Sequence, residues 1–271
     1  MKTRIISAAV AIVVALTLII LGSLFSIVIT IAISLISALL CGEYLSARKL
    51  NKNMIPFIVC LVFAFLIPML SMTVVKYVPV FLFILSVCVY LVVFNKSVKT
   101  DDAIFALAGV TLISVSLSLL NVVACTDQPH SAFWLVFTLG VPWLADSSAY
   151  FAGSYLGKRK LCPDISPNKT VEGAIAGVIG GTLASLLIGL IFQLIYGQVT
   201  IYYGYLLIIG LLSSAVSIIG DLTFSVIKRS CKIKDFGSIM PGHGGMLDRF
   251  DSVLLCIPIV YIFSQFVFLI V

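Results

Sequence analysis

The chain has 271 residues, of which 61% are hydrophobic and only 10% are charged, and its mean hydropathy is +1.22. Soluble globular domains are about 45–50% apolar and about 25% charged, so this composition excludes a soluble protein. The chain is therefore expected to be a membrane protein surrounded by lipid. Its formal net charge is +6, and no nucleic-acid partner is expected.

Successive apolar runs are each about long enough to cross a bilayer as a helix. They lie near residues 5–22, 25–45, 54–72, 78–95, 103–124, 131–156, 171–196, 201–227 and 252–270. Backbone groups in hydrocarbon must form hydrogen bonds within their own segment, which favours helices. The sequence therefore predicts an all-α, polytopic integral membrane protein with about nine transmembrane helices. About five spans would form an N-terminal part, residues 1–130, and the rest a C-terminal catalytic part, residues 131–271.

The distribution of basic residues predicts the orientation. With nine spans, alternate loops lie on opposite sides, and 16 of the 17 lysines and arginines fall on one side. That side receives the N-terminus and the loops at 46–53, 96–102, 157–170 and 228–251, whereas the other receives Lys76. Because basic loops stay in the cytoplasm, the N-terminus is expected inside and the C-terminus on the opposite side.

Several acidic residues lie where charge is costly. Asp146 is within the sixth run and Asp221 within the eighth, and Asp248 and Asp251 open the ninth. Carboxylates inside spans usually line a polar functional cavity, although each alone could be a structural hydrogen-bond partner. Four such residues toward one cytoplasmic end indicate a site that binds a cation or a charged substrate.

The eighth and ninth runs flank a glycine-rich, basic loop. Asp221, Ser225 and Lys228 share one helical face by their i, i+4, i+7 spacing, and Arg229 is next to Lys228. The loop offers backbone amides and positive charge, both of which suit phosphate. Its candidate phosphate-binding residues are Lys234, Gly242, His243, Gly244, Gly245 and Arg249. His243 could act as a base, donate a hydrogen bond to phosphate or only fix the loop.

The loop at 157–170 is a second basic segment. Ser166 and Lys169 precede an expected helix start with Glu172 in its first turn, where an anion would be stabilised. Gly173, Gly177 and Gly181 then repeat a G-x-x-x-G spacing, which favours close helix packing within the chain or across a dimer. The seven cysteines show no C-x-x-C spacing, so neither a disulfide nor a zinc site is expected.

Two blocks resemble the CDP-diacylglycerol synthase family, also called phosphatidate cytidylyltransferases, in its bacterial form. The first runs from Ser225-Val-Ile-Lys-Arg through Lys234-Asp235 to Pro241-Gly-His-Gly-Gly-Met-Leu-Asp-Arg-Phe-Asp251. The second contains Asp146-Ser-Ser-Ala-Tyr150, Gly157-Lys158 and Ile165-Ser-Pro-Asn-Lys-Thr-Val-Glu-Gly173. Departures are small: Met240 replaces a commoner Leu, Ile or Phe, Phe224 stands where many members carry Glu, and Ser148 replaces Gly or Ala.

The resemblance implies that CTP and phosphatidic acid react to give CDP-diacylglycerol and pyrophosphate in phospholipid biosynthesis. It also implies dependence on Mg²⁺, often with a monovalent cation such as K⁺, and a homodimer. Asp221 and Asp248 match the family's metal-binding positions, and Asp146 and Asp251 are further candidates. The expected location is the inner membrane, with the active site facing the cytoplasm.

A mechanism follows as a hypothesis. The lipid phosphate already carries an anionic nucleophile, so the protein's task is positioning and charge neutralisation. Asp221 and Asp248 would hold Mg²⁺ against the CTP phosphates, and Lys169, Lys228 and Arg229 would offset phosphate charge. The loop around His243 would hold the departing pyrophosphate.

Three rival hypotheses predict other sequence features. A proton- or cation-coupled transporter could use the intramembrane carboxylates, but it predicts paired inverted repeats and broken helices in both halves, whereas the charged residues crowd into the second half. A CDP-alcohol phosphotransferase would carry a D-x-x-D-G-x-x-A-R motif, which the sequence lacks. A scaffold without catalysis leaves the buried aspartates unexplained.

Overall fold

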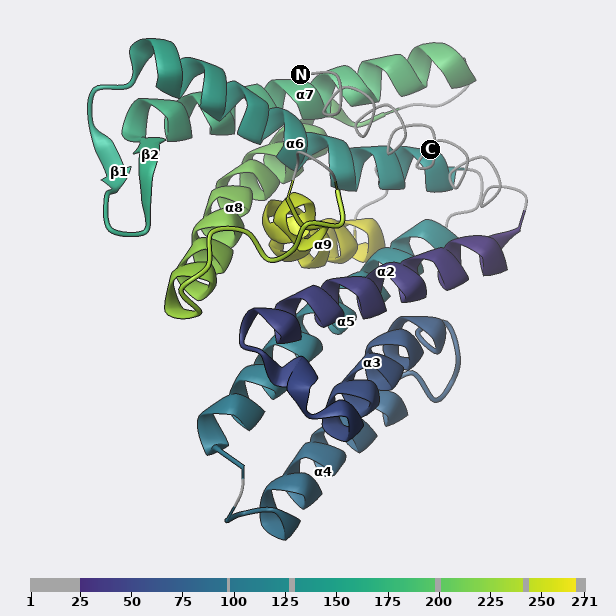
Figure 1. Cartoon of the computed structure of the whole chain (residues 1–271). Helices are drawn as coiled ribbons and strands as arrows, with labels where there is room; N and C mark the ends of the chain where they lie inside the picture. Colours follow the sequence, from purple (N-terminus) through teal and green to yellow (C-terminus); the bar gives the residue numbers. More distant parts are fainter. Residues whose placement is uncertain (1–24, 97, 127–129, 198–200, 241–243, 267–271) are drawn as a thin grey trace. The chain divides into compact units, whose positions relative to one another are not determined.

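A computed structural model describes residues 25–96, 98–126, 130–197, 201–240 and 244–266 (Figure 1). Most of these residues are helical, which confirms the predicted all-α class. The elements are α2 (Ser26–Ala47), the 3₁₀ turn η1 (Leu50–Lys52), α3 (Met54–Met69), α4 (Val78–Val93), α5 (Thr100–Thr126), α6 (Ser131–Leu156), β1 (Lys160–Cys162), β2 (Ser166–Thr170), α7 (Val171–Tyr196), α8 (Tyr203–Ser230) and α9 (Leu247–Phe266). Each predicted run from the second onward coincides with a helix, whereas the first, 5–22, lies outside the described residues.

Helix length supports a membrane-spanning chain. Among the described residues, α2, α5, α7 and α8 are long and apolar enough to cross a bilayer. Helices α3 and α4 are also apolar but have 16 residues each. At about 1.5 Å per residue each would be roughly 24 Å long, somewhat less than the ~30 Å hydrocarbon layer. The total of nine spans and the sides of the two termini stay predictions.

The chain forms two compact units. Unit 1 comprises Met1–Thr126 and Cys231–Asp248, and unit 2 comprises Asp127–Ser230 and Arg249–Val271. The segment between α8 and α9, which contains the glycine-rich loop, thus folds with the N-terminal helices. The functional division proposed at residue 130 stays a prediction.

Unit 1 is built around α2, which packs against α3 and α5. A fully buried amide helps to join these helices: Asn121 Nδ2 donates to Ser71 Oγ at 2.9 Å, and its Oδ1 accepts from Thr30 Oγ1 at 3.0 Å. A buried polar group is tolerated when its hydrogen bonds are made, so this network fixes the register of the helices.

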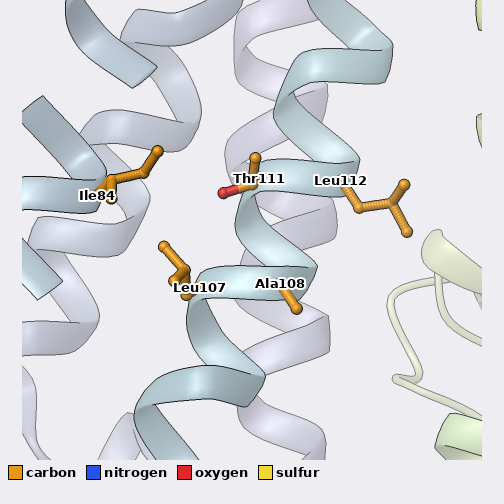
Figure 2. Close-up of a pocket in the computed structure, with 5 residues that line it drawn as sticks. All are labelled: Ile84, Leu107, Ala108, Thr111 and Leu112. Atoms are coloured by element: carbon orange, nitrogen blue, oxygen red, sulfur yellow. The ribbon is translucent and has the colours of Figure 1, made fainter. Parts of the chain in front are cut away.

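A shallow apolar groove lies between α4 and α5 (Figure 2). It has a volume of about 450 Å³, and its lining consists of Ile84, Leu107, Ala108, Thr111 and Leu112. No charged side chain lines it, so it offers no group for binding a nucleotide phosphate.

In unit 2, α7 packs against both α6 and α8 (Figure 1). The buried face of α7 carries Gly173, Gly177 and Gly181. A Cβ on Gly177 would lie 3.0 Å from Ala149 Cβ, and one on Gly181 would lie 2.8 Å from Ala145 Cβ, both on α6. The glycines thus allow close packing within the chain, which the spacing alone had left open.

The other face of α7 is aliphatic and exposed. Ile175, Ile179, Leu183 and Leu187 follow an i, i+4 spacing and are each more than half exposed. Such a stripe is unfavourable in water, whereas in a bilayer it would contact lipid chains. The small-residue face and the large aliphatic face are together typical of a transmembrane helix.

The structure adds one feature that the sequence did not predict, a short hairpin in the loop before α7. Strand β1 pairs antiparallel with β2, with Lys160 opposite Thr170 and Cys162 opposite Ser166. A turn closes the hairpin, where Ile165 N donates to Cys162 O at 3.2 Å. Strands this short carry no periodic signal and depend on their pairing.

Candidate active site

The hairpin of unit 2 places Lys169 at the start of α7. Thr170 is the N-cap of this helix, and its hydroxyl accepts from Gly173 N at 3.1 Å. Glu172 in the first turn accepts from the backbone N–H groups of Lys158, at 3.0 Å, and of Arg159. These bonds tie both ends of the hairpin to the helix start, so the predicted helix start is confirmed and Lys169 is held on a short, fixed strand.

Lys169 forms an ion pair with Asp221 of α8. Both side chains are about one quarter exposed, at 26%. Ser225, one turn later on α8, donates to Asp221 Oδ1 at 3.4 Å, as expected from the predicted shared face. The Asp221 carboxylate thus connects Ser225 of the first motif block to Lys169 of the second.

A second ion pair joins α8 to α9. Lys228 Nζ lies 3.5 Å from Asp251 Oδ2, and the two side chains are only 12% and 10% exposed. The helices approach closely here, because a Cβ on Gly220 would lie 2.7 Å from Asp251 O. A buried acid tolerates ionisation only with such a partner.

Asp146 of α6 completes the charged cluster of unit 2. Its carboxyl interacts electrostatically with Asp221 and Lys169, and Asp251 interacts with both Asp146 and Asp221. We call these five residues, Asp146, Lys169, Asp221, Lys228 and Asp251, the acid–lysine cluster. Three carboxylates and two ammonium groups inside a helical membrane protein form a polar centre. Its carboxylates could bind a metal ion in place of the lysines, and its lysines could bind a phosphate.

Other candidates of unit 2 lie near the ends of the same helices. Arg229 Nε donates to Ile165 O at 3.4 Å, which holds the guanidinium against the hairpin. Ser166, which begins β2, is half-buried. Arg249 is exposed, and its carbonyl accepts from Trp143 Nε1 at 2.9 Å.

Asp248 has a separate set of partners in unit 1. Its Oδ2 accepts from Phe236 N at 2.9 Å and from Gly245 N at 3.0 Å. The carboxylate therefore links the two sides of the glycine-rich loop. Gly244 has a φ of +84°, a conformation that favours glycine.

Three further predicted phosphate-binding residues belong to the segment between α8 and α9. Gly242 and His243 lie outside the described residues. Lys234 is described and exposed, within unit 1. Asp248 belongs to unit 1 and Asp221 to unit 2, so their joint metal site stays a prediction.

Sequence reasoning missed one acid, Glu43 of α2. Its carboxylate is buried and accepts from Met246 N at 3.0 Å and from Leu247 N at 2.7 Å. The signal was present in the sequence, because Glu43 interrupts the second apolar run as Asp146 interrupts the sixth. It stands apart from the two motif blocks, and only folding brings it to the start of α9.

The donor set suits a hard cation. No group of three or more His, Cys, Asp or Glu side chains is arranged for a metal among the residues that the structure describes. The candidate acids, however, offer carboxylate oxygens, which are the protein ligands that Mg²⁺ prefers. In the acid–lysine cluster the ammonium groups lie beside those oxygens.

Comparison with known proteins identifies the family. The model of the cytidylyltransferase family matches residues 2–267. Phosphatidate cytidylyltransferase from Bacillus subtilis is 36% identical over 96% of this chain and 96% of its own length. The Staphylococcus epidermidis protein of the same name is 31% identical over 97% and 98%, and that of Haemophilus influenzae is 37% identical over 52% and 48%. The matched region includes the hairpin, the acid–lysine cluster and the glycine-rich loop, so the chain belongs to the cytidylyltransferase family.

Proposed function

We propose that this protein is a phosphatidate cytidylyltransferase, which makes CDP-diacylglycerol and pyrophosphate from CTP and phosphatidic acid. The observation that carries the proposal is the family match over residues 2–267, together with full-length relatives of that name. The lysines and aspartates gathered in unit 2 support the proposal, because such a reaction needs groups that offset phosphate charge. The transporter alternative receives no support from these comparisons.

In the proposed reaction, an oxygen of the phosphatidate phosphate attacks the α-phosphorus of CTP. A new P–O bond forms, the bond between the α-phosphorus and the bridging oxygen breaks, and pyrophosphate leaves with the electron pair. The nucleophile is already anionic, so no base is needed to remove a proton. The residues must instead align two anions and offset their charge.

Lys169, Lys228 and Arg229 would supply that positive charge. Lys169 and Lys228 each neutralise an aspartate within the cluster. An incoming phosphate could take over one or both ammonium groups, because hydrogen bonds to charged oxygens are strong where water is scarce. The freed carboxylates would then be available to a cation.

Asp221 and Asp248 are the residues we propose to hold Mg²⁺, with Asp146 and Asp251 as further oxygen donors. When bound, the ion would neutralise phosphate charge and favour departure of pyrophosphate. The glycine-rich loop around His243 would hold that leaving group, and a monovalent ion such as K⁺ could occupy a neighbouring position.

The proposed location is the cytoplasmic membrane, with the site at the cytoplasmic end of the helices. The basic loops support it by the positive-inside rule. CTP would enter from the cytoplasm, and phosphatidate would enter sideways from the bilayer with its acyl chains still in lipid. A homodimer is proposed from the family resemblance alone.

The decisive test is synthesis of a CDP-lipid by the purified full-length protein. It is incubated in detergent–phosphatidate micelles with labelled CTP and Mg²⁺, and lipid product and pyrophosphate are measured. Equal amounts of both are expected, and neither without phosphatidate. Pyrophosphate release that does not depend on phosphatidate, or no product from folded protein, would contradict the proposal.

A further inference from the structure

The buried carboxylate of Glu43 accepts hydrogen bonds from backbone N–H groups of the segment before α9. Its two oxygens accept from Met246 N and Leu247 N, at the first turn of α9. Glu43 is only 6% exposed and belongs to α2, about two hundred residues away in sequence. A negative charge at a helix N-terminus is favourable, because the free N–H groups and the helix dipole are both oriented toward it.

Two glycines make room for this carboxylate. A Cβ on Gly237 would lie 2.8 Å from Glu43 Cδ, and a Cβ on Gly245 would lie 2.8 Å from Glu43 Oε2. Both distances are shorter than any normal contact of a Cβ atom. The backbone on both sides of the glycine-rich loop, at residues 236–240 and 244–248, therefore closes around the end of the Glu43 side chain.

The neighbouring residue on α2 strengthens the same contact. The Tyr44 ring stacks on Phe236, with centroids 6.2 Å apart, and on Phe105 of α5, with centroids 4.3 Å apart. Phe236 is buried, and its N–H donates to Asp248 Oδ2. The segment is thus held from α2 by one charged and one aromatic contact.

From these contacts we infer that Glu43 is a positioning residue for Asp248. Asp248 takes its orientation from the N–H groups of Phe236 and Gly245. Glu43 in turn fixes the backbone that carries these two N–H groups. It accepts from Met246 N and Leu247 N, which follow Gly245, and it lies close to Gly237, which follows Phe236. Glu43 would not touch substrate, and its effect on the reaction would pass through the loop. The expected effect of Glu43 on kcat rests on the proposed function, whereas its expected effect on the conformation of the loop does not.

The first variant is Glu43→Gln. A glutamine keeps the size but offers one acceptor oxygen and one NH₂ donor, so either the Met246 or the Leu247 N–H loses its acceptor. We expect kcat to fall by about tenfold to a hundredfold, as for other small misplacements of reacting groups, with KM for phosphatidate nearly unchanged. The matched control is Gly42→Ala on the same turn of α2, whose new Cβ would make an ordinary 3.6 Å contact with Leu61. This control should keep wild-type activity.

A second measurement does not depend on turnover. Ile239→Cys, at a position 55% exposed, is introduced as a probe of the loop, and the native Cys162 on the hairpin serves as internal reference. Peptide mass spectrometry follows maleimide labelling at each position. Labelling at 239 relative to 162 should accelerate several-fold when Glu43→Gln is added. An unchanged ratio overturns the inference, whatever the activity.

A third variant covers the case in which Glu43→Gln fails to fold. Gly237→Ala keeps the acid but adds a methyl group where Glu43 lies, so it should also lower kcat and accelerate labelling at 239. Normal kcat in this variant would overturn the inference. If wild-type protein makes no CDP-lipid, the proposed function fails instead, while the labelling result still decides whether Glu43 holds the loop.

Discussion

At the scale of single residues, the acid–lysine cluster shows why charge persists among lipid-facing helices. Each of Asp221 and Asp251 has a lysine partner contributed by a different element. An acid without its partner would lose most of the compensation for its lost hydration. Pairing therefore stabilises the fold, while the same groups stay available for binding a charged substrate.

The first prediction concerns Asp221. Asp221→Asn should lower CTP-dependent turnover by about a hundredfold or more, since it removes a charge that the transition state requires. The protein should stay folded, because asparagine can still accept from Ser225. Asp164→Asn, at an exposed turn of the hairpin, is the matched control and should stay active. Near-normal turnover in Asp221→Asn would refute its assignment as a metal ligand.

The second prediction separates stability from activity at the buried pair. Lys228→Met leaves Asp251 without this partner and should destabilise the protein by about 3–5 kcal/mol, typical of a broken buried pair. The double variant Lys228→Met/Asp251→Asn should recover most of the lost melting temperature in detergent, yet remain inactive. Lys160→Met, on the exposed side of the hairpin, should change neither property. A double variant no more stable than the single one would show that the pair is not coupled.

At the scale of elements, α7 shows how a transmembrane helix is specified by its two faces. Its glycine face permits close packing on α6, and its Ile and Leu face is left exposed. In lipid, association gains little from hydrophobicity, so close contact between small residues matters more. The precise fit of α7 also fixes Thr170 and Lys169 at its N-terminal end.

The third prediction tests this fit. Gly177→Ala would place a Cβ 3.0 Å from that of Ala149 and 3.1 Å from Ala145 O, so α6 and α7 must move apart, at a cost of about 1–3 kcal/mol. Gly204→Ala on α8 is the control, because nothing lies within 4 Å of its new Cβ. Melting temperatures in detergent should fall for the first and hold or rise for the second. An equal response from both would mean that α7 and α6 are not closely packed.

At the scale of the whole molecule, the orientation in the membrane is predicted from the distribution of basic residues among the loops. The described loops and turns place Lys158, Arg159 and Lys160 at the hairpin and Lys76 after α3. These two regions should lie on opposite sides of the membrane, since basic loops are retained in the cytoplasm.

The fourth prediction tests that orientation. Val74→Cys and Asp164→Cys are introduced separately at fully exposed and exposed positions. In intact cells, a membrane-impermeant maleimide should label position 74 but not position 164, and in inverted vesicles the pattern should reverse. Labelling of both positions from the same side would contradict the alternation of spans from α3 to the hairpin.

The sequence by itself determined the class of protein, the positions of the helices from α2 onward and the family. Each of these depends on local composition or on contiguous motifs: apolar runs of membrane length predict helices, and the blocks around Lys169 and Asp248 carry the resemblance. The face shared by Asp221 and Ser225 was predictable for the same reason, because helical spacing is a local property.

Only the tertiary structure decided which charges are partners. Lys228 shares a helix with Asp221 yet pairs with Asp251, and Lys169 reaches Asp221 from a hairpin with no periodic signal. It also decided that the glycines of α7 pack within the chain and that Glu43 meets the start of α9. These are contacts between segments far apart in sequence, and they depend on how helices pack side by side, which no single segment encodes.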